Sequence, residues 1–164
     1  DLNSRFASAT GTFGFGRKRI SHLRFGGSLR DPKILIVDDS PTMRRIIINC
    51  LKRAGFTNFV EACDGKDALA KLQVEDINLM VTDWNMPEMD GLTLVTAVRG
   101  TEQLKNLPIV MVTMRSVKED IVEAMKAGVD GYIIKPFRPD TLIDKLRKIL
   151  APVASDDKKS DVPG

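Results

Sequence analysis

The sequence predicts an α/β fold in which five parallel strands form one doubly wound sheet with helices on both faces. Between residues 31 and 151, short apolar runs alternate five times with longer segments whose apolar residues recur at helical spacing. The apolar runs are continuous rather than alternating, which is typical of strands buried on both faces. Strands that alternate regularly with helices favour a parallel sheet covered by those helices.

The expected strands and helices follow one another along the chain. Strands are expected at 33–37, 59–63, 77–83, 108–113 and 132–134. Helices are expected at 41–54, 91–99, 116–127 and 139–150, with one more beginning at Gly65. Ser40 and Pro41 suit the N-cap and first turn of a helix, and Gly55 and Gly128 suit helix ends. Right-handed crossovers between five such strands favour the flavodoxin-like order 2-1-3-4-5.

Charge separates this domain, 31–151, from two tails. Residues 1–30 hold six basic residues and one acid among many Gly and Phe, with no strand or helix periodicity. We interpret this segment as a disordered tail or an artefact of cloning; the alternative is a basic arm that touches nucleic acid. Its single His22 is too isolated for a metal site. Residues 152–164 are expected to be a polar tail, and the domain itself carries no excess of positive charge for binding nucleic acid.

Cysteine usage and apolar content favour a cytoplasmic protein. Cys50 and Cys63 lie in apolar runs without metal or disulfide spacing, so we expect both to be buried and reduced. No apolar stretch approaches the ~20 residues of a membrane span, so no membrane association is expected.

Charged residues follow three of the expected strands. Asp38 and Asp39 follow the first strand, Asp83 ends the third, and Lys135 follows the fifth. Open α/β sheets bind ligands at this carboxyl edge, where the strand order reverses, here between the first and third strands. Because buried unpaired charges are costly, we expect these groups to meet in one site. The alternative is that Asp38 and Asp39 only cap the following helix.

Several motifs at this edge resemble the receiver domain of two-component response regulators, most closely its single-domain chemotaxis members. The matching pieces are Val37-Asp38-Asp39-Ser40, Thr42-Met43-Arg44-Arg45-Ile46, Asp83-Trp84-Asn85-Met86-Pro87, Met89-Asp90-Gly91-Leu92, Leu107-Pro108-Ile109-Val110-Met111-Val112-Thr113 and Gly131-Tyr132-Ile133-Ile134-Lys135-Pro136-Phe137. The resemblance extends over 33–150 and implies a phosphorylation-switched signalling domain whose only chemistry is its own Mg-dependent phosphorylation and dephosphorylation.

The resemblance also implies roles for individual residues. Asp83 would be the nucleophile that accepts a phosphoryl group from a phosphohistidine, assisted by Lys135 and Thr113. The implied ligands of Mg²⁺ are Asp39, Asp83, the main-chain carbonyl of Asn85 and, through water, Asp38. The bond between Lys135 and Pro136 would be cis.

An output face is implied on helices 116–127 and 139–150 and the strand between them. The residues expected there are Ile121, Val122, Tyr132 and Lys145. On phosphorylation, Thr113 would move toward the phosphate and Tyr132 would turn inward. Because no DNA-binding domain follows 150 in this sequence, we expect the signal to pass by protein contact. The implied partners are a chemotaxis histidine kinase, a flagellar motor switch protein and, in some systems, a phosphatase.

Two residues depart from the family pattern. Met114 stands where a small residue is usual, and Arg115 stands where the most similar members often carry an acid. We expect both to change access to the site, and Met114 to slow hydrolysis of the phosphorylated state.

Three alternative functions fit parts of this pattern. A single-domain receiver in a non-flagellar phosphorelay fits the same residues. A Mg-dependent aspartyl phosphatase would need a second Asp two positions after its nucleophile, where Asn85 stands. A flavin-binding domain would need a phosphate-binding loop after the first strand, where Asp38 and Asp39 would repel the phosphate.

Overall fold

A computed structural model describes residues 31–151, so the two expected tails and His22 lie outside the described residues. Five parallel strands form one sheet in the order β2-β1-β3-β4-β5, which confirms the predicted fold class and strand order. The strands are β1 (Lys33–Val37), β2 (Asn58–Ala62), β3 (Leu79–Thr82), β4 (Ile109–Thr113) and β5 (Gly131–Ile134). The helices are α2 (Pro41–Arg53), α3 (Gly65–Val74), α4 (Gly91–Arg99), α5 (Lys118–Ala127) and α6 (Pro139–Leu150).

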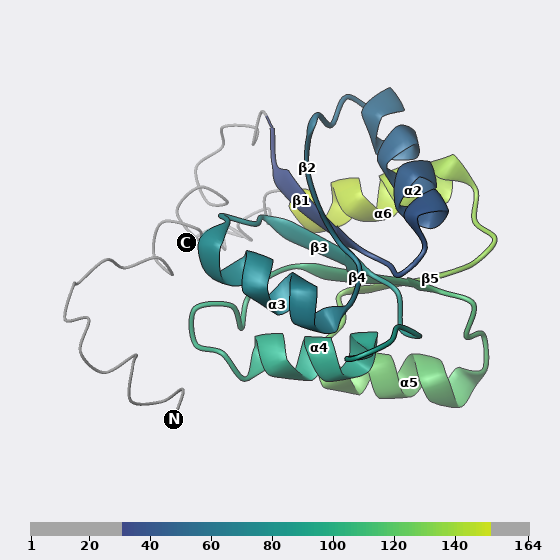
Figure 1. Ribbon diagram of the computed structural model, residues 1–164. Helices are drawn as coiled ribbons and strands as arrows, with labels where there is room; N and C mark the ends of the chain where they lie inside the picture. The colour runs from purple at the N-terminus through teal and green to yellow at the C-terminus, as the bar shows by residue number, and fades with distance from the viewer. Residues whose placement is uncertain (1–30, 152–164) are drawn as a thin grey trace, which may run out of the picture.

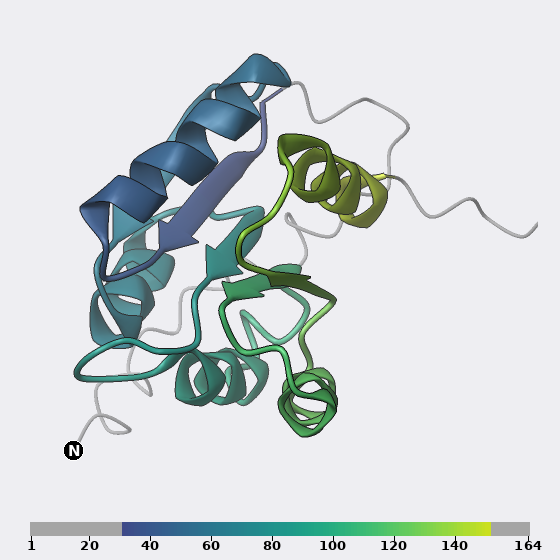
Figure 2. The ribbon, with the colours of Figure 1, turned by 90° about the vertical axis from the view of Figure 1, so that its right-hand side faces the viewer.

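The helices form two layers around the sheet (Figures 1 and 2). Ile34 and Ile36 of β1 pack in a cluster with α2 and α6, and Leu35 and Val37 pack in a second cluster with α3, α4 and α5. Successive side chains of a strand point to opposite faces, so a strand covered on both faces must be apolar throughout. Within the described part of the chain, no helix is both long and apolar enough to span a bilayer.

Several element ends differ from the predicted ones. β3 begins at Leu79 rather than at Ile77, which is buried but donates its N–H to the carbonyl of Glu75 outside the sheet. α5 begins at Lys118, after Val117 at the N-cap position, rather than at Ser116. An apolar residue such as Ile77 can be buried without belonging to the hydrogen-bonded strand, so apolar runs overestimate strand length.

The expectation that Cys63 is buried is wrong. Cys50 is buried in α2, but Cys63 is exposed in the turn between β2 and α3. Its main-chain N–H donates to Asp67 Oδ2 in α3 at 3.0 Å, so Cys63 belongs to the connection that leads into α3 and not to the buried part of β2. An apolar run that ends at a turn cannot by itself show which of its last residues remains covered.

Main-chain hydrogen bonds continue past the strand ends and fix the charged residues at the carboxyl edge. These bonds run from Asp38 N to Ala62 O at 3.1 Å, from Asp83 N to Val37 O at 2.9 Å, and from Lys135 N to Thr113 O at 2.8 Å. The same ladder that builds the sheet therefore positions the backbone of its candidate site.

The loop from Asp83 to Gly91 folds closely onto itself. Gly91 N donates to Trp84 O at 2.7 Å, and Asp90 caps α4 by accepting the N–H of Thr93. A Cβ at Gly91 would lie 1.9 Å from the carbonyl oxygen of Asp83, so only glycine fits here without a backbone shift. The start of α4 thus fixes the main chain of Asp83.

Gly91→Ala is expected to destabilise the protein by about 1–3 kcal/mol or more, because overpacking against backbone forces the loop to move. Urea unfolding measures the loss. The control is Gly100→Ala at the other end of α4, where φ is −79° and the nearest atom to a new Cβ, Thr96 O, is 3.4 Å away. That change should be neutral or slightly stabilising, and equal losses in the two variants would contradict the role of the close approach.

Candidate functional site

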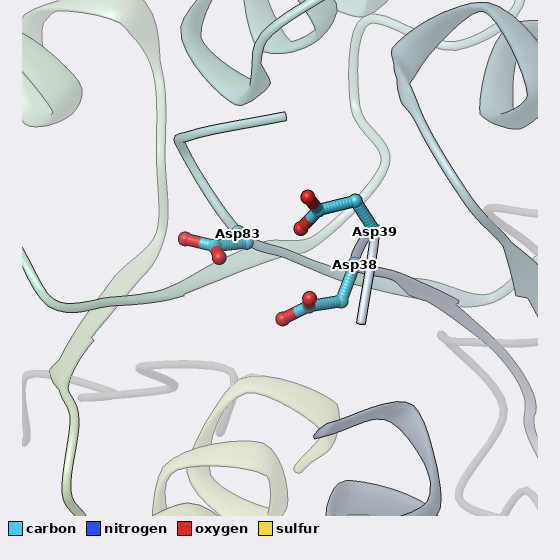
Figure 3. Close-up of side chains that lie close together, drawn as sticks. All are labelled: Asp38, Asp39 and Asp83. Atoms are coloured by element: carbon cyan, nitrogen blue, oxygen red, sulfur yellow. The ribbon is translucent and has the colours of Figure 1, made fainter. Parts of the chain in front are cut away.

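Three carboxylates meet at the carboxyl edge between β1 and β3. One oxygen from each of Asp38, Asp39 and Asp83 lies within 4.8 Å of the others, and Figure 3 shows the three side chains side by side. Asp38 is 2% exposed, Asp83 is partly buried, and Asp39 is exposed. Carboxylates this close repel one another unless cations lie between or beside them.

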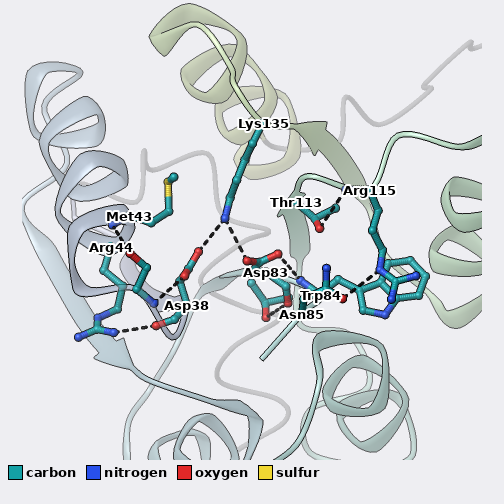
Figure 4. Close-up of polar contacts among 11 residues, drawn as sticks. Asp38, Met43, Arg44, Asp83, Trp84, Asn85, Thr113, Arg115 and Lys135 are labelled. Carbon is teal, nitrogen blue, oxygen red and sulfur yellow. Dashed lines mark hydrogen bonds and ion pairs between the residues drawn. The ribbon is translucent and has the colours of Figure 1, made fainter. Parts of the chain in front are cut away.

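Lys135 provides one such cation from the end of β5. Its Nζ donates to Asp38 Oδ2 at 2.9 Å and to Asp83 Oδ2 at 3.0 Å (Figure 4). Burial lowers the pKa of Lys135, but its hydrogen bonds to the two carboxylates and their charges outweigh this effect and raise the pKa overall. Lys135 is therefore a permanent positive charge, and its bond to Pro136 is cis, as the resemblance implied.

Main-chain groups orient the two more buried carboxylates. Asp38 Oδ1 accepts the N–H of Ser40 at 2.9 Å, and Asp83 Oδ1 accepts the N–H of Trp84 at 2.6 Å. No side-chain partner of Asp39 is found within residues 31–151. The single ammonium of Lys135 bonds only two of the three carboxylates. The remaining negative charge, open to solvent at Asp39, is compatible with a hard divalent cation.

Two further expected site residues lie at the same edge. Thr113 ends β4 and is fully buried, and its hydroxyl accepts the main-chain N–H of Arg115 at 3.4 Å. Asn85 is exposed in the loop after β3, and its side-chain oxygen accepts a hydrogen bond from Arg115 Nε at 3.1 Å. Both residues are therefore linked to the loop that follows β4.

The two residues that depart from the family pattern differ in their surroundings. Met114 directly follows Thr113 in the chain and is 74% exposed, so its side chain lies largely in solvent. The Arg115 guanidinium carbon lies 4.3 Å from the ring centroid of Trp84, and Nη1 lies 3.4 Å from Asp120 Oδ1. Nothing in the sequence spacing pointed to Trp84 as a partner of Arg115.

Arg44 of α2 is a neighbour of the site that sequence reasoning missed. Its Nη1 donates to the main-chain carbonyl of Asp38 at 2.7 Å, and its Nε donates to Glu61 at 2.9 Å. Arg44 lies one helical turn after the N-cap Ser40, and this position within the Thr42 to Ile46 motif was the only available signal.

The four expected output residues lie on α5, β5 and α6. Val122 is 41% exposed, and Ile121, Tyr132 and Lys145 are half-buried. The Tyr132 hydroxyl donates to the carbonyl of Arg115 at 2.8 Å. Further exposed apolar side chains on these elements and on the loop before α5 are Met114, Val117, Met125 and Ile134.

Burial and neighbouring charges raise the pKa of the Tyr132 hydroxyl. Burial raises the pKa of Tyr132, and the negative charge of Asp120 raises it further. Arg115 lowers the pKa in part, and Asp83 adds a smaller increase. The pKa of Tyr132 is therefore set mainly by burial and by the charges of Asp120 and Arg115.

Comparisons with known proteins agree with this geometry. The family model for the response regulator receiver domain matches residues 34–147. The chain is 53% identical over 117 residues to the chemotaxis protein CheY of Pseudomonas aeruginosa, covering 71% of this chain and 94% of that protein. It is 52% identical over 120 residues to chemotaxis protein CheY-3 of Vibrio cholerae, covering 73% and 92%.

Solved structures show the same likeness. The chemotaxis response regulator CheY4 of Vibrio cholerae superimposes with a TM-score of 0.67 at 38% identity, covering 72% of this chain and 98% of that one. The receiver domain of the Francisella response regulator 1452 gives a TM-score of 0.67 at 31% identity, covering 73% and 96%.

Lys135→Met is expected to lower the free energy of unfolding in EDTA by up to about 3–5 kcal/mol, because it leaves the buried carboxylates uncompensated. Added Mg²⁺ should restore part of the loss by replacing the missing positive charge. Chemical denaturation with and without Mg²⁺ measures both effects.

The matched control is Lys66→Met, which removes an ion pair to Glu88 in which both side chains are more than 60% exposed. Such a pair contributes less than about 1 kcal/mol, and Mg²⁺ should not compensate its loss. An equal response of the two variants to Mg²⁺ would contradict the electrostatic account of Lys135.

Proposed function

The chain belongs to the response regulator receiver family, and from this we propose that Asp83 accepts a phosphoryl group from a phosphohistidine of a histidine kinase. The convergence of Asp38, Asp39 and Asp83 with Lys135 is the observation that supports this most strongly. The domain would act as a switch: phosphorylation of one carboxylate changes the charge of the sheet edge and, through it, the output face.

In the proposed transfer, an Asp83 carboxylate oxygen forms a bond to phosphorus while the phosphorus–nitrogen bond of the phosphohistidine breaks. The leaving imidazole nitrogen keeps the electron pair and takes a proton. Lys135 already holds Asp83 Oδ2 at 3.0 Å and is placed to neutralise phosphoryl oxygens beside it. The buried Thr113 hydroxyl, whose oxygen accepts the N–H of Arg115, would donate its proton to another of these oxygens. Such transfers depend on positioning and charge neutralisation more than on covalent assistance.

The proposed cofactor is Mg²⁺. Its ligands would be Asp39, Asp83 and the main-chain carbonyl of Asn85, with Asp38 acting through water. The exposed Asp39 carboxylate and the excess of negative charge suit such an ion, because Mg²⁺ binds oxygen ligands and retains several waters. When bound, the ion would neutralise charge that develops on the transferring phosphoryl group.

The proposed cellular role is in chemotaxis. Several relatives that share about half of their residues with this chain are named chemotaxis proteins. The partners we propose are a chemotaxis histidine kinase as donor and a flagellar motor switch protein as receiver of the signal, in the cytoplasm. A phosphatase could act on the same site. The apolar side chains exposed around α5 and β5 support output by protein contact.

Two alternatives are less well supported. A receiver in a non-flagellar phosphorelay would use the same site, but it would not account for the chemotaxis names of the relatives. An aspartyl phosphatase would need a second Asp two positions after its nucleophile to act as acid and base. At the position two residues on, the chain has Asn85, whose side chain is hydrogen-bonded to Arg115.

Incubation of the protein with acetyl phosphate and Mg²⁺ is expected to add one phosphoryl group, because Asp83 offers an oriented carboxylate beside Lys135. Intact mass measures the adduct. Asp83→Asn should abolish it, as should EDTA.

The matched control is Asp90→Asn in the same loop. Asp90 caps α4 through Thr93 N, and Asn preserves such a cap, so this variant should be phosphorylated like the parent. If the parent shows neither an adduct nor steady consumption of the donor, the phosphoacceptor role of Asp83 is ruled out.

Met114→Ala is expected to speed loss of the phosphoryl group several-fold, because the long side chain directly after Thr113 would restrict the approach of water. Decay of the intact-mass adduct after removal of the donor measures this rate. The control is Met125→Ala on α5, an exposed methionine away from the carboxylates. Equal or slower decay in Met114→Ala would show that Met114 does not shield the site.

A further inference from the structure

Arg115 contacts both the phosphoacceptor loop and the elements of the output face. Its side chain reaches Asn85 and Trp84 on one side and Asp120 of α5 on the other. Its main chain is bonded to Thr113 and to Tyr132. In the described part of the chain, these contacts place one residue between the groups that would bind the phosphate and the tyrosine that would report it. Figure 4 shows Arg115 beside Trp84, Asn85 and Thr113.

The contact with Trp84 gives the Arg115 side chain a fixed platform. Trp84 follows Asp83 directly, is 3% exposed, and donates its N–H to the Asp83 carboxylate. The guanidinium lies 4.3 Å from the centre of its ring, well within the ~6 Å at which a cation is attracted to an aromatic face. The hydrogen bond from Arg115 Nε to Asn85 orients the plane of the guanidinium at the same loop.

The main chain of Arg115 bears directly on two residues of the proposed switch. Its N–H is donated to the Thr113 hydroxyl at 3.4 Å, a long bond that would change if Thr113 moved toward a phosphoryl oxygen. Its carbonyl accepts the Tyr132 hydroxyl at 2.8 Å, a bond of ordinary length. The position of that carbonyl therefore determines where the half-buried Tyr132 side chain must lie for its hydroxyl to form this hydrogen bond.

We propose that Arg115 is a positioning residue that couples the phosphoacceptor loop to Tyr132. By holding its side chain on Trp84 and Asn85, it places its own carbonyl to receive the Tyr132 hydroxyl before any phosphoryl group is bound. This inference rests on the proposed function, in which Asp83 is phosphorylated and Tyr132 belongs to the output face. In this account Tyr132 is preorganised in the resting protein, and phosphorylation acts on a tyrosine that Arg115 already constrains.

The sequence makes the test unusually direct, because it contains one tyrosine and one tryptophan. Protein labelled with 3-fluorotyrosine gives a ¹⁹F resonance that reports Tyr132 alone, and tryptophan fluorescence reports Trp84 alone. Both signals are recorded for the full chain with Mg²⁺, before and after addition of beryllium fluoride, which mimics a phosphoryl group on a carboxylate.

The variants are Arg115→Ala, which removes every side-chain contact, and Arg115→Lys, which keeps the charge but loses the planar stack and the Nε bond. The control is Lys118→Ala, which removes an exposed cation from the first turn of α5. Arg115→Ala should move or broaden the Tyr132 resonance of the resting protein toward that of a solvent-exposed tyrosine. Arg115→Lys should give a smaller change, and Lys118→Ala should match the parent.

The outcomes separate this inference from the proposed function. A beryllium fluoride response of Trp84 that is lost in Asp83→Asn supports the function, whichever result Tyr132 gives. If that response is present but both Arg115 variants keep the parent Tyr132 resonance, the coupling is wrong and the function stands. If the parent shows no response to beryllium fluoride, the proposed function fails and the coupling fails with it.

Discussion

The repulsion among three carboxylates at one sheet edge is the constraint on which the rest of this structure depends. Asp38, Asp39 and Asp83 lie within 4.8 Å of one another, where like charges destabilise the folded state unless they are compensated. Lys135 compensates two of them from the far strand, and main-chain N–H groups of Ser40 and Trp84 hold the remaining oxygens of the same two. A fold selected only for stability would not concentrate charge in this way. The proposed phosphoryl transfer, which needs negative oxygens in a fixed arrangement, would account for it.

Much of the fold and of the site could be predicted because both depend on the order of residues along strands. Apolar runs such as Ile34 to Val37 are continuous because β1 is covered on both faces, so the runs identify the strands directly. Residues immediately after parallel strands must share one edge, so Asp38, Asp83 and Lys135 could be placed together without knowing any side-chain conformation. The roles assigned to them rest on the resemblance to receiver domains and on the chemistry of their groups.

The parts that escaped prediction depend on how loops travel between the strands. The loop after β4 brings Arg115 over Trp84, and no periodicity relates these two residues. Arg44 donates to the carbonyl of Asp38 from the start of α2. The apolar face of α2, which the sequence does predict, does not determine that contact. Cys63 was wrongly expected to be buried because an apolar run continues to it, although β2 ends one residue earlier and a turn carries the thiol into solvent.

The position of β5 explains how a local change of charge could reach a distant face. β5 is an edge strand that pairs only with β4, whereas β1 and β3 lie inside the sheet and are bonded on both sides. Elements with fewer neighbours move at lower cost than central ones.

Lys135, which binds two of the carboxylates, directly follows β5, and Tyr132 lies within this strand. A phosphoryl group on Asp83 would draw Lys135 and Thr113 toward new oxygens, and both are attached to the β4–β5 pair through the bond between Lys135 N and Thr113 O. The chemistry would thus act on one edge of the sheet, which is also where the Tyr132 hydroxyl donates to the carbonyl of Arg115.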